Sequence, residues 1–323
     1  MAPGKVIEIT IAKRSSGGKQ PDGQTPFNAQ KSGTFPKTIQ LSSDATIFDV
    51  KKAIVQLKRG FTSDRQRLTT EDKRALVDDS KTLTQESIKS GDTIYVKDLG
   101  PQVAWKTVFL TEYFGPLFIH PLIYQFAPTL WRTKFEHSTM QKVALGLVLI
   151  HYLKREYETL FVHRFSNATM PQFNIFKNSF HYWILSGVLL AGGVYSPYYS
   201  QKAVQGTIQD NPVFLATFSA IFLLGQLGTG WAHQVLRNLR RPGTKERNIP
   251  RGGLFEFVSC PNYFFEHVVW IAFTILTLNP AAALFTLVSS VQMVLWALKK
   301  HKNYRKEFKD YPRKRTAIFP FVL

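Results

Sequence analysis

The chain has 323 residues, of which 44% are hydrophobic and 14% aromatic, and its formal net charge is +19. In a soluble protein this charge would favour nucleic-acid binding, but much of it lies at the ends of apolar runs, where basic residues contact lipid headgroups and fix orientation. Nucleic acid is therefore not an expected partner. The single cysteine, Cys260, excludes an internal disulfide and a cysteine-based zinc site.

The first hundred residues are polar and carry the pattern of a small mixed domain. Residues 6–11 alternate apolar and polar side chains, and residues 38–41 form a second candidate strand. A Thr-x-x-Asp capping box then predicts a helix over 46–58, and a last strand is expected over 93–97. This order of elements, ending in GDTIYV, resembles the ubiquitin-like β-grasp fold over residues 1–98.

The remaining residues, 99–323, are grouped into apolar runs of about 18 or more residues, the length that spans a bilayer. About six membrane helices are expected, over 109–130, 143–160, 180–195, 212–231, 264–278 and 281–298. The N-terminus has no apolar signal-peptide core, so its domain is expected in the cytosol. The expected fold class is a multi-pass α-helical membrane protein with an N-terminal ubiquitin-like β-grasp domain.

One connection between apolar runs is strongly basic. Residues 237–251 hold six Lys or Arg residues, and Gly252-Gly253 and the run from Cys260 to Tyr263 follow. A basic loop between membrane helices is expected on the cytoplasmic face. Guanidinium groups also pair with phosphate oxygens through two bonds at a time, so the same loop could hold a nucleotide or coenzyme. A topology signal alone would not need the two glycines or the Asn262-Tyr263 pair.

The first two apolar runs carry polar side chains that a passive anchor would not need, among them Glu112, His151, Tyr152, Lys154 and Arg155. Such groups are costly at membrane depth, so they face a cavity or a partner, or else they mark helix ends and extend to the interface. We favour a functional role for Glu112 and Tyr152, and both interpretations stay open for Lys154 and Arg155. Asn167 begins a glycosylation sequon, which has no use on a cytosolic face.

Several reaction classes lack their sequence signature. The eight histidines form no HxxxH, HxxHH or HExxH motif, so no metal site is predicted. Neither a GxSxG nucleophile elbow nor a GxGxxG dinucleotide fingerprint occurs. What remains is a site among membrane helices beneath basic loops, suited to a lipid-like substrate with a phosphorylated cofactor. Hydride delivery from a nicotinamide needs a positioned ring and an acid, and no protein metal.

Several separate motifs resemble the steroid 5-alpha-reductase family. Its C-terminal domain is matched by LRRPGTKERNIPRGGLFEFVSCPNYFFE and KKHKNYRKEFKDYPRKRTAIFPFVL. The very-long-chain trans-2-enoyl-CoA reductases of the endoplasmic reticulum are matched by TEYFGP, HYLKREYETLFVHRFSNATMP and NIFKNSFHYW behind a ubiquitin-like domain. The resemblance implies NADPH-dependent reduction of a conjugated carbon–carbon double bond, as the last step of fatty-acid elongation. It also implies a long-chain enoyl-CoA substrate, contact with membrane lipid and other elongase subunits as partners.

The resemblance further implies which residues bind NADPH: Arg240, Arg241, Arg247, Asn262, Tyr304 and His233. Arg240 and Arg241 match a basic pair of the cofactor surface, and Asn262 matches an asparagine that holds the nicotinamide end. Two positions depart from the wider family. Thr229 and His233 stand where steroid reductases have asparagine and aspartate, which weakens any contact from Thr229. Arg247 and Asn248 replace a Tyr-Arg pair, which shifts the expected 2′-phosphate contact by one residue.

The expected mechanism assigns three catalytic residues. Glu112 and Tyr152 match a pair that hydrogen-bonds the substrate carbonyl, and hydride addition needs a donor aimed at that oxygen. Tyr263 is the candidate acid for the α-carbon, because it lies beside Asn262 and a phenol can give a proton. The alternative for Tyr263 is an interface aromatic that binds a headgroup. Lys154 and Arg155 would bind the coenzyme A phosphates.

Two alternatives of other kinds stay open. A sterol, steroid or polyprenol reductase of the same fold would share the cofactor site and differ in its acceptor. A membrane-tethered ubiquitin-like adaptor would have no activity, and it would leave Asn262 and Tyr263 unexplained. A methyltransferase that uses S-adenosylmethionine would not require so many phosphate-pairing arginines.

Overall fold

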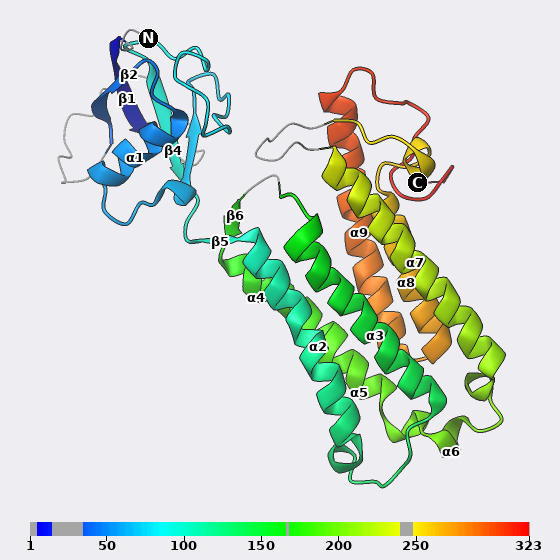
Figure 1. Ribbon diagram of the computed structural model, residues 1–323. Coiled ribbons are helices and arrows are strands. Elements are labelled where there is room, and N and C mark those ends of the chain that lie inside the picture. Colours follow the sequence, from blue (N-terminus) through cyan, green and yellow to red (C-terminus); the bar gives the residue numbers. More distant parts are fainter. Residues whose placement is uncertain (1–4, 15–34, 166–167, 240–247, 323) are drawn as a thin grey trace, which may run out of the picture. The chain divides into compact units, whose positions relative to one another are not determined.

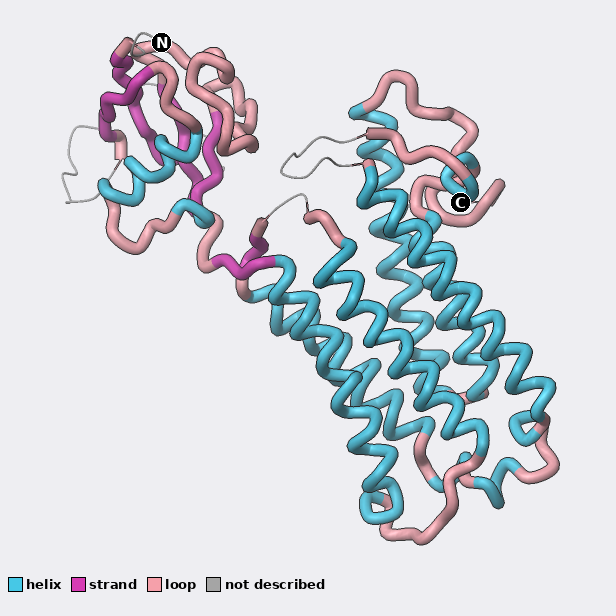
Figure 2. The backbone as a smooth tube through the Cα atoms, in the orientation of Figure 1, coloured by secondary structure: helices cyan, strands magenta, loops and turns pink. Residues whose placement is uncertain are grey.

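The computed structural model describes residues 5–14, 35–165, 168–239 and 248–322 (Figure 1). The chain forms two compact units. The first comprises residues 1–103 together with 169–172, and the second comprises 104–168 and 173–323. Strands belong almost entirely to the first unit, whereas the second unit is helical (Figure 2).

A four-stranded sheet with strand order β2-β1-β4-β3 forms the centre of the first unit. Strand β1 runs antiparallel to β2 and parallel to β4, and β3 runs antiparallel to β4. The elements are β1 (Val6–Lys13), β2 (Lys37–Ser42), α1 (Ile47–Leu57), β3 (Gln66–Thr69) and β4 (Thr93–Asp98). This small sheet gives only weak support to the expected ubiquitin-like domain.

Helix α1 begins where its sequence predicts. The Thr46 side chain accepts from the Asp49 backbone N–H, and the Asp49 side chain accepts from the Thr46 backbone N–H. These reciprocal bonds form the predicted capping box and satisfy N–H groups that the first turn leaves unpaired. The apolar stripe of Ile47, Val50 and Ile54 is buried with the inward side chains of the sheet, in one core.

The second unit contains the long helices. Their bounds are α2 (Trp105–Leu130), α3 (Thr139–Tyr157), α7 (Pro212–Asn238), α8 (Pro261–Thr277) and α9 (Pro280–Glu307). Shorter pieces connect them: β5 (Gln102–Ala104), η2 (Glu158–Val162), β6 (Thr169–Pro171), α4 (Phe173–Ser179), η3 (Phe180–Leu189), α5 (Leu190–Val194) and α6 (Gln201–Val204). Segments η2 and η3 are π-helical. Helices α2 and α3 pack side by side, as do α7 and α8 (Figure 1).

The expectation of about six membrane-spanning helices is wrong. In the described part of the chain, two helices, α7 and α9, are long and apolar enough to cross a bilayer. Helix α8 has 17 residues, and the apolar run over 180–195 is divided between a ten-residue π-helix and the short α5. Helices α2 and α3 are continuous, but polar side chains in α2 and charged side chains at 154–156 in α3 lower their apolar character. Apolar runs in the sequence therefore overstate the number of spans.

Helix α2 continues through all three of its prolines. A proline has no backbone N–H, so the carbonyl four residues earlier loses its helical partner. Pro128 leaves the Tyr124 carbonyl in this state, and His137 Nε2 donates to that oxygen at 2.9 Å. The His137 ring also stacks on the Tyr124 ring at a centroid distance of 3.8 Å. The prolines therefore do not break this segment into shorter helices.

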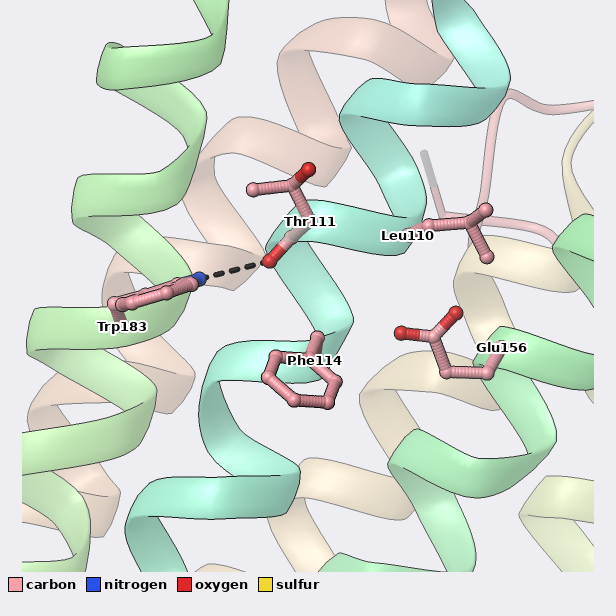
Figure 3. A pocket seen from close by; sticks show the side chains of 5 residues that line it. All are labelled: Leu110, Thr111, Phe114, Glu156 and Trp183. Carbon is pink, nitrogen blue, oxygen red and sulfur yellow. Dashed lines mark hydrogen bonds between the residues drawn. The ribbon is translucent and has the colours of Figure 1, made fainter.

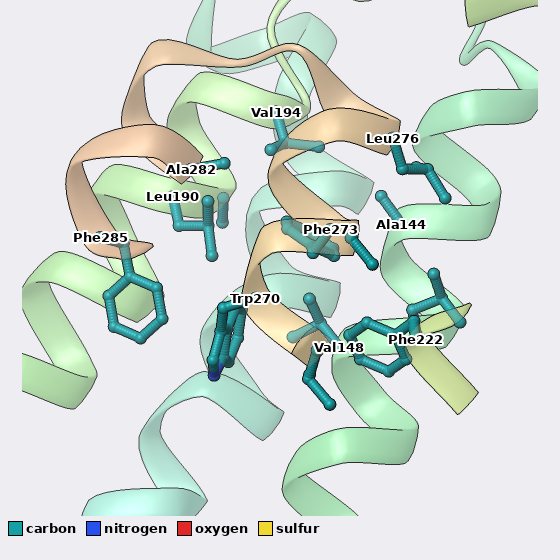
Figure 4. Packing of buried hydrophobic residues seen from close by; sticks show 14 of the residues in the cluster. Ala144, Val148, Leu190, Val194, Phe222, Trp270, Phe273, Leu276, Ala282 and Phe285 are labelled. Carbon is teal, nitrogen blue, oxygen red and sulfur yellow. The ribbon is translucent and has the colours of Figure 1, made fainter. Parts of the chain in front are cut away.

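Aromatic and aliphatic side chains from six helices, α2, α3, α5, α7, α8 and α9, form the core of the second unit (Figure 4). Trp270 and Phe273 of α8 lie near its centre, and the Trp270 and Phe285 ring centroids are 4.6 Å apart in an edge-to-face arrangement. Phe222 of α7 contributes from the opposite side of Phe273 (Figure 4). Edge-to-face pairs place the positive ring edge on the negative ring face, which adds to apolar burial.

Glycines bring α7 and α8 into close contact. A Cβ atom at Gly228 would lie 2.4 Å from Phe265 Cδ1, and one at Gly225 would lie 2.7 Å from Val269 Cγ2. Small residues on one helix face let two backbones approach closely. This contact fixes the first turns of α8, including Asn262 and Tyr263, relative to α7.

Candidate active site

The carboxylate of Glu158 is buried where α3 passes into η2. Its Oε1 lies 2.7 Å from Lys154 Nζ, and its Oε2 lies 3.0 Å from both Arg155 Nη1 and His233 Nδ1. Burial opposes ionisation, but the hydrogen bond with His233 and the charges of Arg155 and Lys154 outweigh burial and lower the pKa of Glu158. The structure thus gathers Lys154, Arg155 and His233 around one negative charge.

This cluster resembles a metal site in composition, but its charges oppose one. Glu158, His163 and His233 offer ligand atoms that all lie within 4.8 Å of one another. Lys154 and Arg155 already occupy the two carboxylate oxygens, however, and their charges would repel a divalent cation. The charge of a second acid, Glu266, also acts on Lys154 and Arg155, so the positive charge of these two residues is already balanced within the described residues.

Arg155 also connects this cluster to a group of buried tyrosines. Its Nη2 donates to the Tyr113 hydroxyl at 2.7 Å, and its guanidinium carbon lies 4.9 Å from the Tyr113 ring centroid. The Tyr113 ring packs edge-on against Tyr182 at 5.2 Å and lies 6.3 Å from Tyr152. The Tyr152 hydroxyl is hydrogen-bonded to Ser186 Oγ. The predicted carbonyl donor Tyr152 is therefore part of a fixed aromatic group.

Glu112 lies next to Tyr113 in α2 and is 1% exposed. Burial raises the pKa of its carboxyl to about 7, against the lowering effects of a hydrogen bond from Asn178 and of the Arg155 charge. Its Oε1 has no hydrogen-bond partner among the residues that the structure describes. The predicted carbonyl-binding pair, Glu112 and Tyr152, thus lies near Tyr113: Glu112 is its neighbour in sequence, and the Tyr152 ring is 6.3 Å away. With a pKa of about 7, a large share of the Glu112 carboxyl groups are protonated at neutral pH and can donate a hydrogen bond.

Asn262 and Tyr263 occupy the first turn of α8. Asn262 is 9% exposed, and its Oδ1 has no hydrogen-bond partner within the described ranges. An unpaired buried amide oxygen is costly, which indicates that a ligand donor completes it. The Tyr263 ring lies 6.4 Å from the Trp296 ring of α9. Burial raises the pKa of the Tyr263 phenol, and the charges of Lys300 and Arg155 oppose that rise.

The structure does not place Tyr263 in the same apolar cluster as Tyr152. Tyr152 belongs to the large core of the second unit, whereas Tyr263 packs against a smaller cluster that includes Cys260, Ala297 and Ile318. Arg155 relates the two groups, because it binds Tyr113 directly and its charge acts on Tyr263. The predicted catalytic residues therefore belong to two different apolar clusters.

A segment near the C-terminus holds the residues before α8. Ser259 N–H donates to the Thr316 carbonyl at 2.9 Å, and Cys260 N–H donates to the Ala317 carbonyl at 3.1 Å. The Ser259 hydroxyl is also hydrogen-bonded to the Tyr311 hydroxyl at 2.6 Å. The Tyr311 ring stacks on Tyr304 at a centroid distance of 5.5 Å. The predicted cofactor residue Tyr304 is thus connected to the segment that precedes Asn262.

Three predicted cofactor residues, Arg240, Arg241 and Arg247, lie outside the described residues. Two neighbours of this stretch are described. Asn248 Nδ2 donates to the Leu239 carbonyl at 3.2 Å. The Thr229 hydroxyl donates to the Gly225 carbonyl of its own helix at 3.0 Å, so it is already used within α7.

A shallow pocket of about 430 Å³ lies on the surface formed by α2, α3 and η3 (Figure 3). Trp183 Nε1 donates to the Thr111 carbonyl at 2.8 Å along one side of it. The lining is mostly apolar, and its one charged residue is Glu156: the residues are Leu110, Thr111, Phe114, Glu156 and Trp183. Since none of these is a predicted site residue, the pocket is distinct from the candidate site.

Sequence reasoning missed Glu158, Ser186 and Arg315. The signal for Glu158 was present, because an acid four residues after Lys154 and three after Arg155 faces both on a helix. Arg315 is 3% exposed, and it donates to the Pro250 carbonyl at 2.9 Å and pairs with Glu256 at 3.2 Å. Ser186 had no sequence signal, since its partner Tyr152 lies in a different helix.

Known proteins match this chain over most of its length. Residues 168–323 match the family described as 3-oxo-5-alpha-steroid 4-dehydrogenase. The very-long-chain enoyl-CoA reductase of Dictyostelium discoideum is 40% identical over 91% of this chain and 98% of its own. A Caenorhabditis elegans protein named as a probable very-long-chain enoyl-CoA reductase is 41% identical over 92% of this chain and 98% of its own. A Homo sapiens trans-2,3-enoyl-CoA reductase-like protein is 32% identical over 92% and 82%.

Residues 168–323 therefore resemble the 3-oxo-5-alpha-steroid 4-dehydrogenase class of proteins. Within that class, the chain belongs to the family of very-long-chain enoyl-CoA reductases. These comparisons confirm the resemblance that the sequence motifs carry.

Proposed function

We propose that the chain reduces the trans-2 double bond of very-long-chain enoyl-CoA with NADPH and releases saturated acyl-CoA, as the last step of the fatty-acid elongation cycle. The observation that carries this proposal is the identity of about 40% to enoyl-CoA reductases over nine-tenths of the chain. The chain is accordingly an oxidoreductase that acts on carbon–carbon double bonds. The sterol reductase and adaptor alternatives have no comparable support.

The described residues fit a phosphorylated nicotinamide cofactor. The unpaired Oδ1 of Asn262 can accept a hydrogen bond from a carboxamide N–H. Arg240, Arg241 and Arg247 are assigned to the 2′-phosphate end of the cofactor, and Tyr304 and His233 are assigned to the cofactor site. NADPH, when bound, supplies the hydride. Lys154 and Arg155 are assigned to the coenzyme A phosphates.

The side chains then handle charge and protons. Negative charge develops on the thioester oxygen as the β-carbon is reduced, so Tyr152 and protonated Glu112 stabilise it by donating hydrogen bonds. Tyr263 gives its proton to the α-carbon. Its raised pKa keeps the phenol protonated at neutral pH, which this role requires. Bulk water regenerates the Tyr263 phenol after each turnover.

The setting of the reaction is proposed as the endoplasmic reticulum membrane. Helices α7 and α9 are long and apolar enough to cross that membrane. Residues 1–98 are proposed as a cytosolic domain that is not needed for chemistry, and residues 99–323 as the catalytic domain. The elongase, ketoreductase and dehydratase of the elongation cycle are proposed as partners, because each consumes or supplies an acyl-CoA on the same membrane.

The test uses the full chain, purified in detergent, with a long-chain trans-2-enoyl-CoA and either NADPH or NADH. The expected result is loss of nicotinamide absorbance with NADPH and formation of saturated acyl-CoA by mass spectrometry. A sterol with a conjugated ketone and a polyprenol serve as competing acceptors. Turnover of either acceptor without turnover of enoyl-CoA would overturn the proposal, as would the absence of any reduction by folded protein.

A further inference from the structure

Four fully buried residues are joined in two separate sets of hydrogen bonds that meet at Ser186, one at its hydroxyl and one at its backbone carbonyl. The Tyr152 hydroxyl is bonded to Ser186 Oγ. The Ser186 backbone carbonyl lies 2.7 Å from His120 Nε2, and His120 Nδ1 lies 2.8 Å from the Tyr195 hydroxyl. All four residues are 0% exposed. Because a carbonyl only accepts, Nε2 carries the imidazole hydrogen, and neutral His120 therefore accepts from Tyr195.

Ser186 makes these two bonds through different atoms, its hydroxyl and its backbone carbonyl. It lies in the π-helical η3, where the Leu190 N–H bonds to the carbonyls of Gly187 and Leu185 and not to that of Ser186. The Ser186 carbonyl accepts from His120 Nε2, which holds the backbone at this point against α2.

The neighbouring residue sets how closely η3 approaches α2. A Cβ atom at Gly187 would lie 2.8 Å from Ile119 Cδ1, so the two helices touch directly beside Ser186. The position of Ser186 Oγ is thus fixed from both sides, by the His120 bond and by this contact. A hydroxyl held this firmly can orient the phenol that it binds.

We infer that Ser186 is a positioning residue for the proposed reaction: it donates its hydroxyl hydrogen to the Tyr152 oxygen. A phenol has one hydrogen, so a donor behind the Tyr152 oxygen leaves that hydrogen free for the substrate carbonyl. As charge develops on the thioester oxygen, the Ser186 bond holds the Tyr152 hydroxyl in the orientation that donates to that oxygen. The inference rests on the proposed function, and it adds a residue that family resemblance did not suggest.

A double-mutant cycle tests this inference with the full chain, an enoyl-CoA and NADPH. Tyr152→Phe is expected to lower kcat about 10²-fold, as for loss of one oxyanion donor. Ser186→Ala is expected to lower kcat about tenfold with the KM for NADPH unchanged, since a positioning role supplies part of that effect. The double variant is expected to match Tyr152→Phe alone, because the serine acts through the phenol. If the fold-losses in kcat of the two single variants multiply in the double variant, the inference is overturned.

Three further variants control for packing. Ser186→Thr keeps the hydroxyl and is expected to recover most of the lost kcat, whereas the similarly sized Ser186→Cys is expected to resemble Ser186→Ala. Ser196→Ala removes another buried hydroxyl, which donates to the Gly193 carbonyl at 2.9 Å, and it is expected to leave kcat unchanged. If Ser186→Ala fails to fold, the cycle uses Ser186→Cys. Wild-type protein without turnover would refute the proposed function, whereas active wild-type protein with multiplying losses would refute only the role of Ser186.

Discussion

Glu158 Oε1 lies 2.7 Å from Lys154 Nζ, one helical turn earlier, while the second carboxylate oxygen contacts Arg155 and His233 at 3.0 Å each. One buried acid therefore balances several basic groups at the junction of α3 and η2. Breaking such a pair from one side leaves buried charge without compensation, which costs more than the pair itself contributes.

Glu158→Gln is therefore expected to destabilise the helical unit by about 3 kcal/mol, the scale for removing one partner of a buried ion pair. Because the folded pKa of Glu158 lies below the unfolded value, its contribution is fully present above the unfolded pKa of about 4.3 and is lost as pH falls towards the folded pKa. Chemical unfolding at neutral and acidic pH measures both effects. The wild-type and variant proteins should converge in stability at low pH; a constant difference would contradict the assignment.

A second expectation concerns the ionisation of Glu112. Burial raises its pKa to about 7, so the protonated donor is lost as pH rises through that value. The wild-type kcat should fall between about pH 6 and pH 8, and Glu112→Gln, which keeps an N–H donor at every pH, should flatten this limb. If the kcat of Glu112→Gln still falls between about pH 6 and pH 8, a group other than Glu112 causes the pH dependence.

The assignment of Tyr263 as the acid depends on its hydroxyl alone. Tyr263→Phe keeps the ring beside Trp296 and should leave folding and NADPH binding unchanged. Turnover should fall by about 10²- to 10⁴-fold, as for loss of a general acid. Steady-state kinetics with a separate NADPH-binding measurement checks this. Retention of more than about a tenth of turnover would show that another group or water supplies the proton.

NADPH preference is assigned to the basic pair Arg240 and Arg241. Replacing both by alanine should raise the KM for NADPH far more than the KM for NADH, because only NADPH carries the 2′-phosphate that guanidinium groups pair with. The two cofactors are compared in the same assay at fixed ionic strength. Equal increases in the KM for NADPH and the KM for NADH would show that other residues bind the 2′-phosphate.

The close contact of α7 and α8 gives a prediction about stability. Gly228→Ala places a methyl group 2.4 Å from Phe265 Cδ1 and should cost about 1 to 3 kcal/mol through overpacking. Gly146→Ala in α3 is the matched control, because a Cβ there meets nothing within 4 Å. That control should stabilise the protein by up to about 1 kcal/mol, from helix propensity alone. Thermal unfolding of both variants in the same detergent tests the pair.

Local patterns predicted some elements well. The Thr46–Asp49 capping box and the strands over 6–11 and 93–97 occur where the sequence places them. Membrane spans were overestimated because apolar composition does not distinguish a continuous helix from a π-helix joined to the short α5. Length, charge and helix continuity together decide whether a run can cross a bilayer.

Candidate site residues were found by motif, but their partners were found only in the structure. Motifs singled out Lys154, Arg155 and Asn262, whereas the contacts of Arg155 with Tyr113 depend on how α2 and α3 pack. The Tyr152–Ser186 bond likewise joins α3 to η3. Such pairs join segments far apart in sequence, and no pattern within one segment specifies them.

The pairing of residues 316 and 317 with Ser259 and Cys260 has a consequence for synthesis of the chain. Ser259 is synthesised long before its partner Thr316. The N–H groups of Ser259 and Cys260 therefore lack these hydrogen-bond partners until residues 316 and 317 have been made. A growing chain that stops short of Thr316 would have every residue of α8 and its contacts with α7, but it would lack the two backbone bonds that hold the residues before that helix. The segment before Asn262, on the nicotinamide side of the proposed site, therefore takes its position from residues that lie much later in the chain.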